Sequence, residues 1–404
     1  MKPQTMASIE YEDIKFEEKD NEIIATFLNL FEFTINKEEL EKLGECKINK
    51  HSIEINTQSE EKATNKINFL VECGLNQLTN KISKQPTTYI HRLSNIPLIG
   101  TPSFGIVDKG TNFLEIKPIT SCNIDCVYCS VDEGLSSKKT RDYVIEEEYL
   151  FDELKKLVEF KECDELEIYI NPNGEPLLYQ PLTKLIQDMH SLKQIKKIHL
   201  ITNGTLLSKD KINKLADAGL TNISLSLSSL NNKEIMGKTC NLTHIKEMAE
   251  YASKKLNLTL TPVWVPKIND EEIDKIVQFS KEINVKIAIQ NFLVHKGGRK
   301  PTKKEKPWKD FYKQLEELEQ KHDVKLSFQE EQPDIIKTKE YETPFKKNEV
   351  LEARIVCPGR KPGEQIVRAM HRAITVIDSN RNSGKIKMKI VRAAHNILLA
   401  KFCR

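Results

Sequence analysis

The middle of the chain alternates between two spacings of its hydrophobic residues. Short runs rich in Ile, Leu and Val predict strands at residues 112–118, 166–170, 197–202, 222–227, 258–265 and 285–291. Between them, apolar residues three and four apart predict helices at residues 145–160, 178–192, 209–218, 244–256 and 271–283. Strands that alternate with helices form a parallel sheet, whose active site lies where the strands end. We therefore expect the functional residues at those strand ends.

The flanking segments follow other patterns. Residues 22–33 alternate as a strand does, and residues 37–43 and 60–78 have helical spacing, so we expect a small N-terminal α+β unit. Residues 84–100 contain Pro86, Pro97 and Gly100 and predict a connector. Residues 305–322 predict an amphipathic helix, whose aromatic residues Trp308, Phe311 and Tyr312 we interpret as packing rather than ligand contacts.

The end of the chain changes to short strands separated by turns. They are expected at residues 350–356, 365–370, 373–377, 386–391 and 397–402. Strands this short and this close together predict a small closed or nearly closed β-barrel. The expected domains are residues 1–96, an N-terminal unit with its connector; 97–296, the α/β core; 297–347, a helical extension; and 348–404, the barrel.

Composition and charge narrow the class of protein. Hydrophobic residues make up 39% of the 404 residues and charged residues 30%, which is typical of a globular protein. Every apolar run is far shorter than the roughly 20 residues that span a membrane. The polar N-terminus has no signal-peptide pattern, so we expect a cytoplasmic protein with no membrane partner. From Leu351 to the end, the chain has twelve basic and three acidic residues, a formal charge of +9. The residues before Leu351 carry a formal charge of −6. A polyanionic partner is therefore expected at the barrel.

Three of the nine cysteines, Cys122, Cys126 and Cys129, lie within eight residues after the first core strand. In a reducing compartment this crowding indicates a metal site. Thiolates are the preferred protein ligands of iron–sulfur clusters, and three of them leave one iron of a cubane open for another ligand. The alternative is a zinc loop completed by a distant Cys or His.

The Cys-x3-Cys-x2-Cys spacing, with Tyr128 just before the third cysteine, resembles the radical S-adenosylmethionine (SAM) superfamily. The resemblance covers about residues 97–292 and implies a partial (β/α)6 barrel. It further implies a 4Fe–4S cluster on the three cysteines, whose open iron binds SAM. A low-potential donor reduces the cluster, and cleavage of SAM gives a 5′-deoxyadenosyl radical. The protein then supplies binding and orientation.

The same resemblance suggests SAM-binding residues, in addition to Tyr128, at the later strand ends. Asn173-Gly174-Glu175-Pro176 resembles the family's Gly-Gly-Glu segment, in which Glu175 meets the methionine ammonium. The other implied positions are Asn203, Ser226, Ser228 and Val263. Each also has a plainer interpretation: Asn203 opens a turn, and the serines fit the interior of a barrel. For Asp132, Glu133, Thr140 and Arg141, just after the cysteines, a solvated surface loop is the favoured interpretation, and a role in orienting cofactor or substrate is the alternative.

The segments at residues 99–111 and 130–134 resemble an uncharacterised archaeal branch of the superfamily that ends in a TRAM-like domain, an OB-like RNA-binding barrel. The expected function is therefore radical modification of an RNA, with tRNA as the expected substrate and the basic barrel as its handle. One alternative is radical modification of a small metabolite or peptide. Another is an RNA-binding protein with a structural iron–sulfur cluster.

Overall fold

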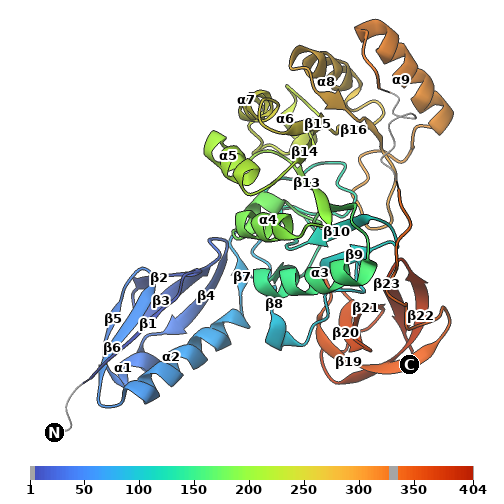
Figure 1. Ribbon diagram of the computed structural model, residues 1–404. Helices are drawn as coiled ribbons and strands as arrows, with labels where there is room; N and C mark the ends of the chain where they lie inside the picture. The colour runs from blue at the N-terminus through green and yellow to red at the C-terminus, as the bar shows by residue number, and fades with distance from the viewer. Residues whose placement is uncertain (1–4, 327–334, 404) are drawn as a thin grey trace.

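The computed structural model describes residues 5–326 and 335–403 (Figure 1). Residues 1–4 of the N-terminal unit, residues 327–334 of the expected helical extension and Arg404 of the basic tail lie outside the described residues. Figure 1 shows three parts: an N-terminal unit that projects to one side, an α/β core, and a β-barrel beside the core. Among the described residues, no helix is long and apolar enough to cross a membrane.

The N-terminal unit packs α2 and the short α1 against antiparallel sheets with strand orders β1-β6-β5 and β2-β3-β4-β7. Its elements are β1 (Thr5–Glu10), β2 (Ile14–Lys19), β3 (Glu22–Phe27), β4 (Phe31–Asn36), α1 (Glu38–Glu41), β5 (Gly44–Ile48), β6 (Ser52–Thr57), α2 (Glu60–Leu75) and β7 (Thr79–Asn80).

The strand expected at residues 22–33 is a hairpin instead. Leu28 and Asn29 adopt positive φ angles of 49° and 58°, so the chain reverses between β3 and β4. Two consecutive residues of positive φ form the turn that suits a tight hairpin. The polar–apolar alternation continues through both strands, which hid the turn in the sequence.

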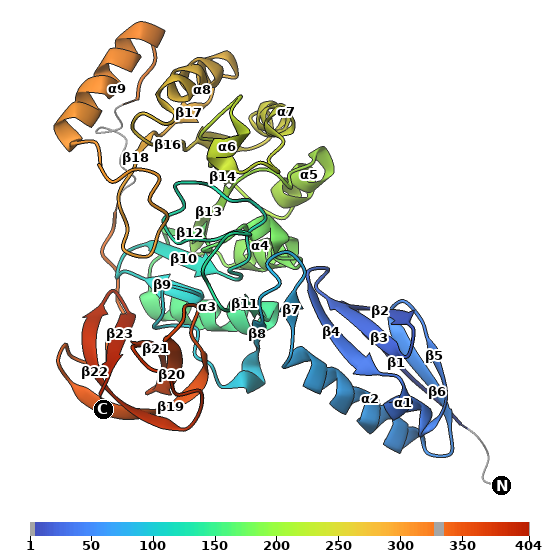
Figure 2. The same ribbon diagram turned by 180° about the vertical axis from the view of Figure 1, so that it is seen from behind.

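The core sheet confirms the parallel α/β prediction. Its order is β17-β15-β14-β13-β12-β10-β9, and every neighbouring pair is parallel except β10 and β9. The strands are β9 (Gly105–Asp108), β10 (Phe113–Lys117), β12 (Leu166–Ile170), β13 (Ile195–Thr202), β14 (Asn222–Leu225), β15 (Asn257–Leu260) and β17 (Lys286–Ile287). Figure 2 shows the same strands from behind.

Helices alternate with these strands. They are α3 (Glu147–Lys161), η2 (Pro176–Leu178), α4 (Leu182–Ser191), α5 (Lys209–Asp217), α6 (Lys233–Met236), α7 (Leu242–Ala252), α8 (Asp270–Glu282) and α9 (Trp308–His322). The predicted helix at residues 178–192 is shorter than expected, because α4 begins only after Pro181. Small additional elements are β8 (Thr87–Ile90), η1 (Arg92–Ser94) and β11 (Asp142–Ile145), of which β8 pairs with β11.

The last two predicted core strands are each interrupted. After β15 the chain forms β16 (Val263–Trp264), and after β17 it forms β18 (Gln290–Asn291); β16 and β18 pair with each other. Pro262 lies at the first break, where its missing N–H prevents a continuous ladder. Hydrogen bonds from Ala288 N–H to Leu260 O and from Gln290 N–H to Pro262 O, both 2.8 Å, still join the two segments across the breaks.

The C-terminal strands form a closed barrel of order β19-β20-β21-β23-β22, consistent with an OB-like domain. They are β19 (Val350–Pro358), β20 (Gln365–Ala369), β21 (Arg372–Ile377), β22 (Lys385–Ala394) and β23 (Ile397–Phe402). Its core includes Val367, Ile374, Met388 and Leu398.

The barrel packs directly on the core. The Leu398 N–H donates to Gly100 O at 2.7 Å, and Thr140 N–H donates to Arg360 O at 2.9 Å. A Cβ at Gly100 would lie 2.0 Å from Ala373 O, so only glycine permits this approach. Cys357, Ile366 and Ala373 of the barrel join the hydrophobic core of the rest of the chain. The barrel is thus a fixed part of the molecule.

Candidate active site

The three cysteines lie on the loop between β10 and β11, and all of them line one cavity of about 890 Å³. Backbone and amide groups approach their sulfurs. The Glu133 N–H donates to Cys129 Sγ at 3.2 Å, and Asn203 Nδ2 lies 4.0 Å from Cys122 Sγ. N–H groups directed at sulfur stabilise thiolates and tune iron–sulfur clusters. The loop therefore has the donor environment that a thiolate-bound cluster requires.

Burial keeps two of these thiols, Cys122 and Cys126, protonated when no metal is bound. It raises the pKa of Cys126 to about 12 and that of Cys122 well above its usual range. A bound cation reverses this effect, because a coordinating thiol loses its proton. Within residues 5–326 and 335–403, no three His, Cys, Asp or Glu side chains converge on the position of a single metal ion. The cysteines instead face a shared cavity, where each can bind a different iron of a cubane.

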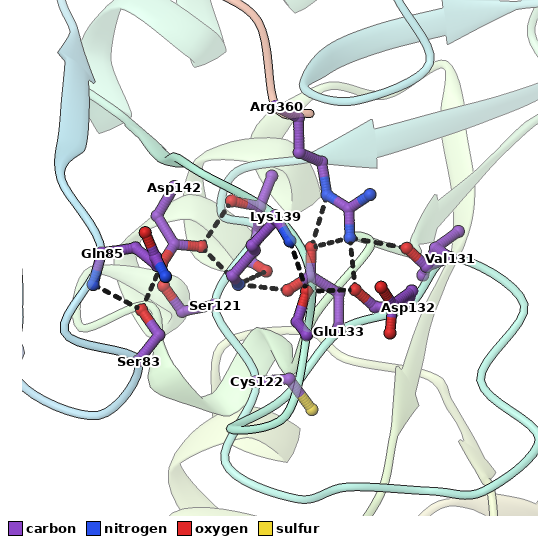
Figure 3. A network of polar contacts seen from close by, with 12 residues as sticks. Ser83, Gln85, Ser121, Cys122, Val131, Asp132, Glu133, Lys139, Asp142 and Arg360 are labelled. Carbon is purple, nitrogen blue, oxygen red and sulfur yellow. Dashed lines mark hydrogen bonds and ion pairs between the residues drawn. The ribbon is translucent and has the colours of Figure 1, made fainter. Parts of the chain in front are cut away.

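A buried network of charged side chains supports the cysteine loop (Figure 3). Lys139 contacts Glu133 and donates to Asp142 Oδ1 at 2.7 Å. Arg360, from the loop between β19 and β20, donates through Nε to Glu133 Oε1 at 2.7 Å. Burial lowers the pKa of Lys139, but the adjacent Asp142 and Glu133 raise it above its usual value. All four side chains are buried and paired, as buried charges must be.

The network corrects one prediction from the sequence. Glu133 was expected on a solvated surface loop, but it is only 1% exposed. Its partners come from nearby Lys139 and from Arg360 in the barrel, and local sequence does not reveal the second. Arg360 also donates to the backbone oxygens of Val131 and Asp132, at 2.6 and 2.8 Å. The prediction was wrong for Glu133 because Arg360 of the barrel pairs with its buried side chain, whereas Thr140 is exposed as expected.

The network extends into the N-terminal unit. Asn80 Nδ2, at the end of β7, donates to Asp142 Oδ2 at 2.9 Å and to Ser121 Oγ at 2.7 Å. Ser121 directly precedes Cys122. Both accessory parts of the chain are therefore connected, through buried polar contacts, to the segment that carries the cysteines.

Arg299 is a second arginine that contacts the cysteine loop. Its guanidinium donates to Asp125 Oδ1 at 2.8 Å, to Asp132 Oδ1 at 3.0 Å and to Cys126 O at 3.0 Å. Its backbone N–H donates to Cys129 O at 2.9 Å. Arg299 lies 174 and 167 positions along the chain from these two acids, and no sequence pattern links them. The cysteine loop is therefore held by two arginines, Arg299 and Arg360.

Gly174 lets the end of β12 approach this loop. A Cβ at Gly174 would lie 1.9 Å from Ser121 O, closer than any side chain tolerates. The Glu175 N–H donates to the same oxygen at 2.8 Å. The segment predicted to bind SAM therefore lies directly against the segment predicted to bind the cluster.

Glu175 is buried, and its carboxylate already accepts hydrogen bonds from the protein. Leu177 N–H and Thr202 Oγ1 donate to Oε1 at 3.0 and 2.6 Å, and Asn203 N–H donates to Oε2 at 2.8 Å. Burial raises the pKa of Glu175, although these hydrogen bonds act to lower it. The carboxylate thus positions the turn after β13, and its predicted contact with the SAM ammonium stays a prediction.

The remaining predicted residues divide into two groups. Tyr128, Asn203, Ser226 and Val263 line the cavity together with Gly174 and Glu175. Ser228 does not line it; the residue is fully buried, and its Oγ accepts a hydrogen bond from Val263 N–H at 3.0 Å. Ser228 therefore joins the end of β14 to β16, and its predicted contact with SAM stays a prediction.

A buried polar atom without a partner indicates that the cavity accommodates a ligand. Asn291 Oδ1 is buried and has no hydrogen-bond partner in the described parts of the chain. Asn291 lines the cavity together with the three cysteines. Because an unpaired buried polar atom is unfavourable, a bound molecule is the expected source of this partner. Three thiols and an unpaired amide oxygen on one cavity fit a thiolate-bound cluster with a polar organic ligand beside it.

Sequence reasoning missed several residues that line the same cavity. Lys117, at the end of β10, is 8% exposed and donates to Asn171 O at 2.6 Å; burial lowers its pKa. Its position at a core strand end was the available signal. Trp308 and Tyr312 of α9 also line the cavity; they pack edge-on against Phe311, but about half of each side chain stays exposed. Phe311, between them, is buried as predicted.

Comparison with known proteins agrees with this geometry. The family model of the Radical SAM superfamily matches residues 116–280. An uncharacterized protein of Methanocaldococcus jannaschii is 33% identical to this chain, over 95% of this chain and 96% of the relative. The GTP 3′,8-cyclase of Clostridium botulinum is 29% identical over 52% of this chain and 64% of the relative. Among solved structures, Streptococcus suis SuiB bound to S-adenosylmethionine has a TM-score of 0.42 and 18% identity, over 79% of this chain and 72% of that one.

Proposed function

This chain belongs to the radical SAM superfamily, whose enzymes use a 4Fe–4S cluster and SAM, and on that premise we propose that it modifies an RNA, with tRNA as the expected substrate. The observation that carries the RNA part of the proposal is the OB-like barrel with its row of exposed lysines, fixed beside the cysteine loop. The cluster part rests on Cys122, Cys126 and Cys129, which share one cavity.

The chain's own residues would hold and orient the cofactors. When bound and reduced, the cluster supplies the electron that cleaves SAM into methionine and a 5′-deoxyadenosyl radical. Cys122, Cys126 and Cys129 would hold three irons, and Arg299 and Arg360 would keep their loop in place. Enzymes of this superfamily need a reductant, and we expect a low-potential electron donor as a partner. Tyr128, Asn203, Ser226 and Val263 are the proposed contacts of SAM.

The outer face of the barrel supports a polyanionic substrate. On β22, Lys385, Lys387 and Lys389 are exposed while the residues between them are buried, so the three lysines share one face. Arg354, directly opposite Lys385 on β19, extends the same basic face. OB-like barrels bind oligonucleotides, and phosphate contacts supply most of the non-specific affinity.

The position of the barrel brings such a substrate close to the reaction cavity. A second cavity of about 260 Å³ lies between barrel and core, lined from the barrel by charged residues that include Arg360, Lys361, Glu364 and Arg392. Ser130, Val131 and Asn173 line both cavities, so the two adjoin. An RNA bound to the barrel would therefore lie beside a passage toward the cluster loop.

A free nucleotide is the second candidate substrate. The similarity to GTP 3′,8-cyclase, across about half of this chain, favours it. In that case the barrel would be a scaffold rather than an RNA handle. Comparative mass spectrometry of RNA nucleosides, from cells with and without this protein, separates the two. Loss of a modified nucleoside supports RNA modification, whereas identical nucleosides in every RNA class would contradict it.

A further inference from the structure

The start of α9 presents an aromatic surface at the edge of the reaction cavity. Trp308 and Tyr312 line the cavity, yet they remain 51% and 46% exposed. Their rings stack with centroids 5.9 Å apart and an interplanar angle of 29°. Phe311 is buried and contacts both rings edge-on, which fixes their orientation. An exposed, pre-oriented aromatic pair beside a cavity is typical of a binding surface.

The segment before α9 is strongly basic. Residues 295–309 contain seven Lys and Arg residues and one acid, Glu305. The exposed lysines of this segment are Lys296, Lys300, Lys303, Lys304 and Lys309. In the part of the chain that the structure describes, none of these five ammonium groups forms an ion pair or a hydrogen bond. Their positive charge is therefore available to a ligand.

The same segment connects this surface to the proposed cluster site. Arg299 lies within it and holds the cysteine loop through Asp125 and Asp132. His295 and Trp308, near its two ends, line the cavity that Cys122, Cys126 and Cys129 also line. A group held against Trp308 thus enters the cavity in which the proposed radical would form.

We infer that the mouth of this cavity binds a single-stranded segment of the RNA substrate, with one base stacked on the Trp308–Tyr312 pair and the neighbouring phosphates at the lysines of residues 296–309. This inference rests on the proposed function and names where the target nucleotide binds. Single-stranded nucleic acids are bound by this combination of aromatic rings that stack on bases and cations that follow the backbone. A basic segment alone would attract any polyanion; the adjacent ring pair selects a nucleotide.

Binding of two matched oligomers tests the stacking contact. The full cluster-loaded chain is titrated with labelled oligoadenylate of eight residues and with an abasic ribose–phosphate octamer, and GTP is titrated separately. Trp308→Ala is expected to weaken oligoadenylate binding about 5- to 150-fold, the range for removing one stacked base. It should leave the affinity for the abasic octamer unchanged. Phe69→Ala, which removes an exposed ring of α2, is the matched control and should change neither affinity.

The phosphate contacts are tested by salt dependence. Changing Lys296, Lys300, Lys303 and Lys304 together to Gln should flatten the log–log slope of binding against salt, by about 0.7 for every phosphate that is no longer neutralised. An unchanged slope would overturn the role of these lysines.

The remaining outcomes separate this inference from the proposed function. Equal affinity of wild type and Trp308→Ala for oligoadenylate, or equal weakening for both octamers, would overturn the stacking site while RNA modification remained testable by nucleoside analysis. In a further outcome, wild type binds GTP but neither oligomer, and Trp308→Ala weakens the binding of GTP. This result would overturn both RNA as the occupant and RNA modification as the function. It would favour the free-nucleotide candidate.

Discussion

Arg360 of the barrel lies 2.7 Å from Glu133, four residues after the last cysteine of the proposed cluster loop. The two residues are 227 positions apart in the chain. Because both side chains are buried, the ion pair makes the barrel part of the wall behind the cysteines. Removing the whole barrel would therefore disturb the cluster loop as well as the RNA handle, so point variants are the sharper tests.

Arg360→Gln should loosen the cysteine loop. Breaking a buried ion pair by removing one partner lowers the free energy of unfolding by about 3–5 kcal/mol. We expect this decrease in urea unfolding, together with faster release of iron from the loaded protein. Arg354→Gln, at an exposed site on β19, is the control. Unchanged stability and iron retention in Arg360→Gln would contradict the structural role of this pair.

Replacing any of Cys122, Cys126 or Cys129 with Ala should abolish cluster binding and SAM cleavage. The reconstituted wild type should contain about four irons per chain, since three thiolates can hold a four-iron cubane. Cys73→Ala, on α2, should retain both properties. Formation of 5′-deoxyadenosine under dithionite by the triple-alanine variant would refute the assignment of these cysteines.

Glu175→Gln should weaken SAM binding while iron content stays constant. Hydrogen bonds to charged groups contribute roughly 1.5–3 kcal/mol, or about 10- to 150-fold in affinity. Thr202→Val keeps the Glu175 carboxylate but removes its hydrogen bond from Thr202 Oγ1. This variant distinguishes a direct contact between Glu175 and SAM from a role of Glu175 in positioning the turn at Asn203. Equal weakening in both variants would indicate that Glu175 acts through the turn at Asn203. Wild-type affinity in Glu175→Gln would remove the residue from the SAM site.

Charge reversal of Lys385, Lys387 and Lys389 to Glu should weaken RNA binding and flatten its salt dependence. The log–log slope is expected to change by about 0.7 for each single-strand phosphate that the barrel no longer neutralises. A matched triple reversal in the N-terminal unit uses the exposed lysines Lys19, Lys50 and Lys62. If both triple variants bind RNA equally weakly, binding follows net charge and the barrel face has no special role.

Glu272 should make the loop after β14 sensitive to acid. Its carboxylate accepts hydrogen bonds from Ser229 Oγ at 2.8 Å and from the N–H groups of Leu230 and Asn231 at 2.7 and 2.9 Å. Although burial acts to raise it, Lys275 and these contacts lower the pKa of Glu272 to about 2.

A folded-state pKa below the unfolded value of about 4.3 stabilises the fold above that pH, and the stabilisation is lost as the pH falls toward 2. The difference in urea midpoint between wild type and Glu272→Gln should therefore be largest at neutral pH and shrink below about pH 4. Glu271→Gln, at the exposed neighbouring position, should show no such trend. A difference that stays constant down to pH 3 would rule out this titration.

The core was predictable because its strands are short segments rich in Ile and Leu, separated by helices of clear periodicity. Residues 166–170 carry three such residues, and their bounds coincide with those of β12. In the N-terminal unit the charged, outward-facing residues of β2 and β5 obscure the strand pattern. A strand with one solvated face and several lysines and glutamates resembles a loop when its pairing partners are unknown.

The candidate site was predictable only where one short segment carries the chemistry. The cysteine spacing lies within one short segment, and Gly174 likewise belongs to a short motif. The structure explains why this position is glycine, because its backbone lies directly against Ser121 O. Glu133, Arg299 and Arg360 form ion pairs with residues that are far away in the sequence and close only in the folded chain. Motif spacing cannot predict such pairs. Helical periodicity also fails at α9, because it identifies an apolar face without saying whether that face meets a core or a cavity.

The buried chain of contacts from Asn80 through Asp142, Lys139 and Glu133 to Arg360 limits how this molecule can be rebuilt. A chimera that joins this core to a barrel from another protein would leave Glu133 without its second cation. A new N-terminal unit would leave Asp142 without its amide donor. The three parts of the chain therefore depend on one another, and useful crossover points lie outside these contacts.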